Sequence, residues 1–527
     1  MKNFIVKSGL PFTIVRNEAF REFCGVVQPM RKIPCYQTVM KAIDQDFIKM
    51  VESLKKTLSK VDYVSITTDG WTAVNKSFLG YTVSWLNGDL QRKGAVLACR
   101  RFVGSHTYDM LANHINQVLM DYDIQNKTVG VTTDGATNYG KAFKMFASED
   151  LDENDNEVAE DSDEDDDAIT SIDLASLLEK THDEDPDGIE LPPHYICAAH
   201  ALNLLGKKDI QKADSNKTFK LQSRSFFTKM RAIWNIQARS SKQADIIREV
   251  CKKLFKIPGE TRWNSTYDSV VVALKIIEES GDNLAQLMTK LQFTYKFKQS
   301  DILFAKEYVE VMTPIATALD KLQGDDVTLG YVLPTIIKIK NSLLDFQDKK
   351  NLQICLPLVN SLLDGVHKRF EHLFLRKDYI IASVSTPMFK TFWITSQDKK
   401  AEAIEMLRSA EKSFRPKPDK TEAPCAKSNL ETGDFLHFDD EDADEEEDPI
   451  EAYLKSKDRT LDLLKQFPSL LKVYQKFNTV LPSSASVERL FSHGSLIFGK
   501  KRHRLLDKNF EAQLMLKCNK WLSEDVC

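Results

Sequence analysis

The 527-residue sequence has no long apolar run and no closely spaced pair of cysteines. A membrane-spanning helix needs roughly 18 or more predominantly apolar residues, and no stretch of this chain reaches that length. The opening residues, MKNFIVKSGLPF, lack the apolar segment of a secretory signal peptide. Nine scattered cysteines without a CxxC pair indicate reduced thiols rather than a disulfide framework. These absences predict a protein that works inside the cell and has no membrane partner.

Basic residues are nearly missing from two segments. Residues 147–190 contain 20 Asp or Glu and one Lys, and residues 428–452 contain 12 Asp or Glu with no Lys or Arg. The net charge of −5 conceals this division, because the rest of the chain carries +26. A basic body favours nucleic acid as partner, since phosphate attraction dominates sequence-independent binding. The tracts themselves also fit plain solvated linkers, and we expect residues 150–190 and 425–448 to be disordered.

The tetrapeptide TTDG occurs twice, each time after a short apolar run. Its aspartates, Asp69 and Asp134, are 65 residues apart, and there is no third copy, so a solenoid repeat is excluded. Residues 61–146 read as three antiparallel strands, a helix over TYDMLANHINQVLMDY and a fourth strand over TVGVTTDG. A fifth strand follows the acidic tract in HYICAAHALNLL and runs into a helix.

This strand order predicts that the two aspartates lie close together. A helical crossover returns the chain for a strand parallel to the first and beside it, so Asp69 and Asp134 occupy the same ends of neighbouring strands. Two close carboxylates repel each other unless a cation lies between them, and Mg²⁺ suits carboxylates, water and phosphate oxygens. The alternative is that each TTDG is a strand followed by an ordinary Asp-Gly turn.

A third acid lies near the C-terminus in LPSSASVERLFSHGSLIFGKKRHRLL. Ser483 and Ser484 are expected to cap a helix whose apolar stripe includes Val487 and Leu490. Glu488 falls at the edge of that stripe, which suits a carboxylate reaching the rim of a sheet. It equally suits a glutamate on an ordinary helix surface.

Six blocks occur together in an order that resembles hAT-superfamily transposases and the BED-type zinc-finger proteins derived from them. They are TTDGWT, TTDGATN, CAAHALNLL, RWNSTYDS, LQGDDVTLGYVLP and SSASVERLFSHGSLI. The resemblance implies an α/β RNase H-like catalytic core with a mixed five-stranded sheet, interrupted by a large all-α insertion domain. It further implies that Asp69, Asp134 and Glu488 are the catalytic DDE triad and bind two divalent ions, Mg²⁺ or Mn²⁺.

The chemistry implied by this resemblance is DNA cleavage and strand transfer. Two metal ions can activate water or a 3′-hydroxyl and stabilise the leaving oxygen. In the family the reaction leaves a hairpin on the flanking DNA, which requires an unstacked base that an aromatic ring can support. The RW motif of the family matches Arg262 and Trp263, so Trp263 is the candidate stacking residue. The alternative is a tryptophan buried in the core.

Cys197 and His200 form the only CxxH motif in the sequence. A zinc site needs four ligands, and no second pair stands at finger spacing, so we expect no zinc in this chain. The family carries this CxxH motif just after its fifth strand. A local role near the catalytic core is therefore expected.

The C-terminal segment NFEAQLMLKCNKWL places Phe510, Leu514, Cys518 and Trp521 on one helix face. This face could cap the core, but the segment matches the dimerisation region of the family, and large aromatics are enriched at interfaces. We therefore expect a homodimer or higher oligomer.

A basic run precedes this segment. It contains Lys500, Lys501, Arg502 and Arg504, which could contact DNA or act as a nuclear import signal. The expected location is the nucleus.

Two departures from the family weaken the case for an autonomous transposase. No BED finger is present, although LPFTIVRNEAFREFC resembles the segment that normally follows one, so the finger was lost or lies outside this chain. The acidic tract also separates Cys197 from Asp134 by 63 residues. The competing interpretation is a domesticated, catalytically silent nuclear dimer that associates with DNA or chromatin in transcriptional regulation. An unrelated RNase H-like exonuclease would leave the RW and SASVERLFS blocks unexplained.

The sequence thus predicts seven regions. They are an N-terminal helical segment (1–60), the first part of the core (61–146), an acidic disordered insert (147–190), the core strand with the CxxH motif (191–205), a helical insertion domain (206–424), an acidic linker (425–452) and C-terminal helices that complete the core and contain the dimerisation region (453–527).

Overall fold

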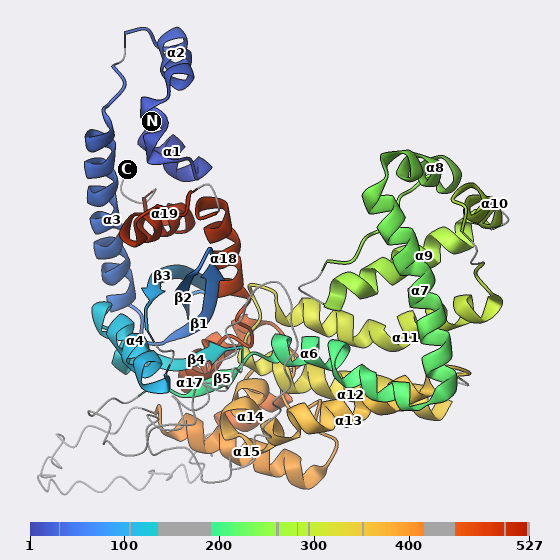
Figure 1. Ribbon diagram of the computed structural model, residues 1–527. Coiled ribbons are helices and arrows are strands. Elements are labelled where there is room, and N and C mark those ends of the chain that lie inside the picture. The colour runs from blue at the N-terminus through green and yellow to red at the C-terminus, as the bar shows by residue number, and fades with distance from the viewer. Residues whose placement is uncertain are drawn as a thin grey trace, which may run out of the picture.

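A computed structural model describes most of the chain (Figure 1). The described residues are 1–30, 32–104, 107–134, 191–259, 263–281, 283–293, 296–349, 352–415, 448–499 and 502–523. None of the helices in these ranges is both long and apolar enough to span a bilayer.

Five strands form one mixed sheet, as the sequence predicts. They are β1 (Val64–Ala73), β2 (Lys76–Leu86), β3 (Arg92–Phe102), β4 (Thr128–Thr133) and β5 (His194–Ile196). Their spatial order is β3-β2-β1-β4-β5, with β1, β2 and β3 antiparallel and with β4 and β5 parallel to β1.

A tight turn and a helical crossover produce this order. The turn between β1 and β2 consists of Val74 and Asn75, whose φ angles of 48° and 64° are typical of a type I′ hairpin. Helix α4 (Tyr108–Asp121) then returns the chain for β4 and buries Leu111 and Ile115. The oxygen of Thr107 accepts the amide of Met110 and caps the start of this helix.

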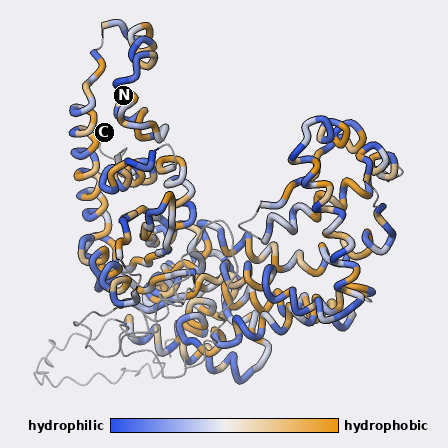
Figure 2. The backbone as a smooth tube through the Cα atoms, in the orientation of Figure 1, coloured by the Kyte–Doolittle hydropathy of each residue, from blue (hydrophilic) through white to orange (hydrophobic). Residues whose placement is uncertain are grey.

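Helices from both ends of the chain pack around the sheet (Figure 1). Those that pack against the sheet are α3 (Tyr36–Ser59), α18 (Ala485–Ile497) and α19 (Asp507–Cys518), whereas α1 (Lys2–Ser8) and α2 (Glu18–Val27) lie farther from it. Hydrophilic and hydrophobic turns alternate along α3 in Figure 2, as expected for a helix with one face on the core.

The described residues between β5 and α18 form only helices and loops. The longer helices are α6 (Ala198–Lys207), α7 (Lys217–Arg239), α8 (Ser241–Cys251), α9 (Trp263–Ser280), α10 (Asn283–Lys290), α11 (Gln299–Leu322), α12 (Val332–Lys349), α13 (Leu356–Phe370), α14 (Lys377–Val384), α15 (Gln397–Lys412), α16 (Pro449–Lys455) and α17 (Pro468–Asn478). The predicted apolar stripe of α11, including Phe304, Tyr308 and Leu319, is buried. One hydrophobic core connects this region with Tyr195 of β5.

The end of the expected acidic linker (425–452) is helical. Asp448 caps α16, which begins at Pro449, by accepting the amide of Ile450. Its carboxylate also accepts two hydrogen bonds from Arg408 at 2.8 and 2.9 Å. Local capping and ion pairing therefore order residues that composition alone assigns to a linker. Residues 425–447 and the expected insert 147–190 lie outside the described residues.

Candidate functional site

Asp69 and Asp134 lie at matching levels of neighbouring parallel strands, although only Asp134 follows the end of its strand, and β1 continues past Asp69 to Ala73. Thr67 of β1 pairs with Thr132 of β4, and each aspartate follows its threonine by two residues. Both side chains are partly buried. The pairing places the two aspartates beside each other where β4 ends, as the predicted strand order indicates, but Asp69 lies within β1 and not at its end.

Glu488 reaches the same region from the first turn of α18. Gly80 of β2 is paired with Asp69, and a Cβ atom at Gly80 would lie 2.6 Å from the Phe491 ring and 2.8 Å from Val487. Both of these residues belong to α18 and flank Glu488 in its sequence. The absence of a side chain at Gly80 therefore lets α18 touch the backbone of β2 directly beside Asp69.

Three hydroxyl groups connect the strands to the start of α18. The oxygens of Thr67 and Thr82 lie 2.6 Å apart, and the Ser486 oxygen lies 2.8 Å from Thr67 and 2.9 Å from Thr82. Thr67 precedes Asp69 by two residues, and Ser486 precedes Glu488 by two. This hydroxyl triangle therefore fixes the helix that carries Glu488 against the strand that carries Asp69.

Removal of the Ser486 hydroxyl should weaken the contact between α18 and the strands and destabilise the protein. In Ser486→Ala, Thr67 and Thr82 still bond each other, but two hydrogen bonds to α18 are lost, so we expect about 1–2 kcal/mol less stability in urea unfolding. Ser495→Ala is the matched control, because Ser495 bonds only the Ser492 carbonyl of its own helix and is exposed. Equal stability losses in both variants would contradict the structural role of the triangle.

Asp134 and Glu488 act electrostatically on Asp69. Burial raises the pKa of Asp69 well above its ordinary value, the charge of Asp134 raises it further, and Glu488 adds a smaller effect. The Gly70 amide opposes this rise by donating a 2.7 Å hydrogen bond to Asp69 Oδ1. A cation beside Asp69 would offset both effects and stabilise its charged form.

The donor chemistry of this site fits Mg²⁺ or Mn²⁺. Carboxylate oxygens are ligands that both ions prefer, and Asp69, Asp134 and Glu488 are the residues that would bind them. Within the described residues, however, no three His, Cys, Asp or Glu side chains are arranged around a single metal position. The fit therefore rests on charge and donor type.

Cys197 forms hydrogen bonds with the end of β4, the first turn of α6 and the start of α18. It caps α6 by accepting the amide of His200 at 3.2 Å, and the same sulfur accepts the amide of Ser484 at 3.3 Å. Its own amide donates to the Thr133 carbonyl at 2.7 Å. Burial raises the pKa of this thiol, which favours the neutral form. The CxxH spacing thus lets the cysteine cap the N-terminus of α6. The other hydrogen bonds of Cys197 hold the residues after Thr133 next to those before Glu488.

Trp263 belongs to the core. Its side chain is 5% exposed, and a Cβ atom at Gly206 of α6 would lie 2.5 Å from its ring. Its amide donates to Asn203 Oδ1 at 2.9 Å. The buried alternative considered for this residue is the one that the structure supports, and the ring as placed cannot stack on a base. Arg262 lies outside the described residues.

The predicted dimerisation face is mostly internal. Phe510 and Leu514 are fully buried, and Cys518 and Trp521 are partly buried. The Trp521 ring packs 6.1 Å from that of Trp85 in β2. The prediction that Phe510 and Leu514 face a second chain is therefore wrong for this structure, because α19 lies between the sheet and the N-terminal helices.

One residue of the basic run has a structural role. Arg502 donates to the Gly9 carbonyl at 2.7 Å and to Gln513 at 2.9 Å, so it connects the end of α1 with α19. Arg504 is exposed and stays a candidate for DNA contact. Lys500 and Lys501 lie outside the described residues.

Known proteins resemble parts of this chain. The family model of the ZBED1 RNase-like domain matches residues 67–161. A Zea mays protein named as an AC transposase is 25% identical over 270 residues, which cover 50% of this chain and 29% of that protein. A second Zea mays protein, named as an AC9 transposase, is 25% identical over 270 residues, or 28% of its length.

A fungal protein resembles a shorter part. The Talaromyces stipitatus protein named as the transcriptional regulator tpeD is 32% identical over 139 residues, which cover 26% of this chain and 16% of that protein. The matches therefore span less than a third of each maize protein and about a sixth of the fungal one.

Proposed function

We propose that this chain is a hAT-derived transposase-like protein that cleaves DNA and transfers its strands at the site of Asp69, Asp134 and Glu488. The observation that carries the proposal is the placement of Asp69 and Asp134 on adjacent parallel strands with Glu488 beside them on α18. In this proposal the sheet and its helices are an RNase H-like core, and the helices between β5 and α18 are an all-α insertion domain.

The three acids would bind two Mg²⁺ or Mn²⁺ ions, which supply an activated nucleophile and stabilise the leaving oxygen. The chain's own contribution is positioning. Gly70 orients the Asp69 carboxylate through its amide, the hydroxyl triangle holds α18 on the strands, and Cys197 aligns the segments next to Asp134 and Glu488. Correct placement of reacting groups can supply a large part of a rate enhancement.

The partner in this proposal is DNA, and the site of action is the nucleus. The +26 charge outside the acidic tracts supports a polyanionic partner, and the names of the maize relatives support DNA in particular. We further propose that the protein works as a homodimer or higher oligomer, with an interface that does not use Phe510 and Leu514.

The second candidate function is that of a catalytically silent regulator bound to DNA or chromatin. The relative named as a transcriptional regulator favours it. Both functions require DNA binding, and only the first requires the three acids to bind metal and support catalysis.

Incubation of the purified chain with supercoiled plasmid and Mg²⁺ or Mn²⁺ tests the proposal. We expect nicked and linear products that EDTA prevents and that Asp134→Asn abolishes. DNA binding without cleavage, at any concentration of either metal, would overturn the catalytic proposal and favour the regulator. Cleavage that persists in Asp134→Asn would place the chemistry elsewhere.

A further inference from the structure

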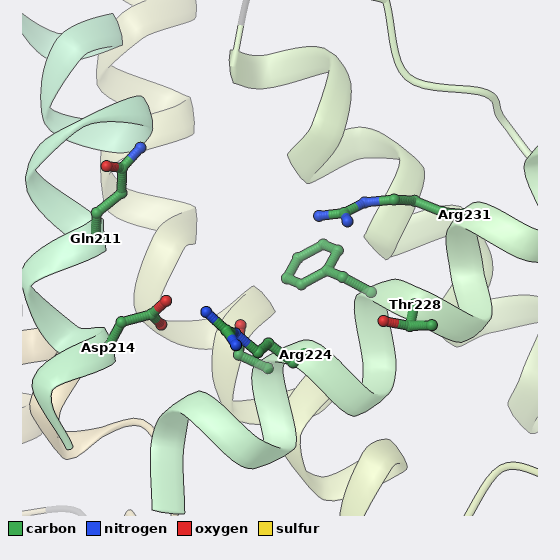
Figure 3. A pocket seen from close by; sticks show the side chains of 7 residues that line it. Gln211, Asp214, Arg224, Thr228 and Arg231 are labelled. Atoms are coloured by element: carbon green, nitrogen blue, oxygen red, sulfur yellow. The ribbon is translucent and has the colours of Figure 1, made fainter. Parts of the chain in front are cut away.

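A cavity of about 670 Å³, lined by polar side chains and by Phe227, lies in the helical region between the 3₁₀ segment Asp209–Ser215 and α7. Figure 3 shows Gln211 and Asp214 on one side and Arg224, Thr228 and Arg231 on the other. The three α7 residues are spaced i, i+4 and i+7, which places them on one helix face. Two guanidinium groups and a hydroxyl group are therefore presented to the same space.

The two arginines differ from most others in the helical region. Neither Arg224 nor Arg231 forms an ion pair with any residue that the structure describes, and both are exposed. By contrast, five arginines of this region are paired with carboxylates, namely Arg248, Arg369, Arg376, Arg408 and Arg415. Charges left in solvent beside a cavity are available to an anionic ligand.

More basic residues extend this face along α7. Lys220 is partly exposed one turn before Arg224, and Lys217 is exposed two turns before it. The face from Lys217 to Arg231 is about 21 Å long at 1.5 Å per residue. A duplex presents roughly twelve phosphate charges over that length. A row of cations on this scale matches a nucleic-acid backbone better than a single small anion.

We propose that this cavity binds the phosphate backbone of DNA, with Arg224 and Arg231 each contacting a phosphate. Guanidinium groups form bidentate hydrogen bonds with phosphate oxygens, and the hydroxyls of Ser223 and Thr228 and the amide of Gln211 can donate to further oxygens. Asp214 repels phosphate and lowers the affinity of the site. The proposal rests on the proposed function, because DNA is the substrate there.

The cavity lies away from the three acids. Helix α7 belongs to the helical lobe of Figure 1, whereas β1, β4 and α18 belong to the lobe that contains the sheet. A phosphate bound at Arg224 and Arg231 would therefore belong to DNA held outside the reacting site. This part of the chain would hold the substrate, and the chemistry would take place at the three acids.

Binding of a fluorescent 30-base-pair duplex, measured by anisotropy in EDTA, tests the proposal without catalysis. We expect Arg224→Ala/Arg231→Ala to weaken binding at least tenfold and to lower the slope of log K against log salt by about two. Arg239→Ala is the matched control, because Arg239 is exposed on the same helix beyond the cavity, and its effect should stay within twofold. Asp214→Asn should strengthen binding, which misfolding cannot imitate.

Competition with dAMP identifies the source of the phosphate. If dAMP at millimolar concentration displaces the duplex from the wild-type protein as well as unlabelled duplex does, the cavity is a free-nucleotide site and the proposal is overturned. Unchanged affinity and salt slope in the double variant would overturn it too, as would weaker binding by Asp214→Asn. A wild-type chain that binds DNA through Arg224 and Arg231 but never cleaves would refute only the catalytic function.

Discussion

Asparagine in place of Asp69 should abolish metal-dependent cleavage and at the same time stabilise the metal-free protein. Cleavage is expected to fall by about three orders of magnitude, because metal ions supply several kcal/mol of transition-state stabilisation. Without metal, the substitution removes a partly buried charge that lies beside Asp134 and Glu488. The variant should therefore melt a few degrees above the wild type in EDTA.

Thermal unfolding with and without Mg²⁺ separates these effects. Added Mg²⁺ should raise the melting temperature of the wild type, since a ligand of the native state stabilises it, but should not raise that of Asp69→Asn. Asp62→Asn is the control, because Asp62 is exposed just before β1 and should change neither cleavage nor metal response. Full activity in Asp69→Asn, or an equal Mg²⁺ effect on both proteins, would remove Asp69 from the metal site.

The sheet could be predicted from the sequence because its strands have local signatures. Apolar residues at alternate positions mark β2, and the helical spacing of Leu111 and Ile115 marks the crossover that makes β4 parallel to β1. The burial of β2 goes further than alternation predicts. Its residues from Phe78 to Leu86 are buried on both faces, because helices cover both sides of a central strand.

The burial of Trp263, Phe510 and Leu514 inside their own chain could not be predicted from the local sequence pattern. An apolar helix face is the same in sequence whether it covers its own core or another chain. For α19 the N-terminal segment makes the difference between these two cases. Ile5 and Val39 pack with Ala512 on the side away from the sheet, so α19 is covered by its own chain. Trp263 is buried because Gly206, 57 residues earlier in the sequence, leaves room for its ring.

Positioning residues were missed for a related reason. Thr67 and Ser486 adjoin acids that the sequence identifies, yet a hydroxyl in a strand and one in a helix give no sign that they meet. The same holds for Arg224 and Arg231, whose spacing on one helix face is visible in the sequence, whereas the cavity beside them requires the 3₁₀ segment of the tertiary structure.

A methyl group at Gly80 should separate α18 from the sheet. In Gly80→Ala the new Cβ would lie 2.6 and 2.8 Å from two atoms of the Phe491 ring and 2.8 Å from Val487, which is too close for carbon atoms in contact. Overpacking of this kind costs about 1–3 kcal/mol. Because Glu488 lies between the two displaced residues, cleavage should also fall, by roughly a hundredfold for a displacement near 1 Å.

Two further variants decide whether this close approach is the cause. Gly88→Ala, in the turn after β2, has no atom within 4 Å of the new Cβ and should behave as the wild type. Leucine lacks the ring atoms nearest to Gly80, so Gly80→Ala/Phe491→Leu should recover part of the lost stability even though it gives up the Phe491 contact with Trp71. Urea unfolding of the four proteins measures these differences. A Gly80→Ala protein as stable and as active as the wild type would mean that α18 does not need the bare backbone of β2 to bring Glu488 beside Asp69.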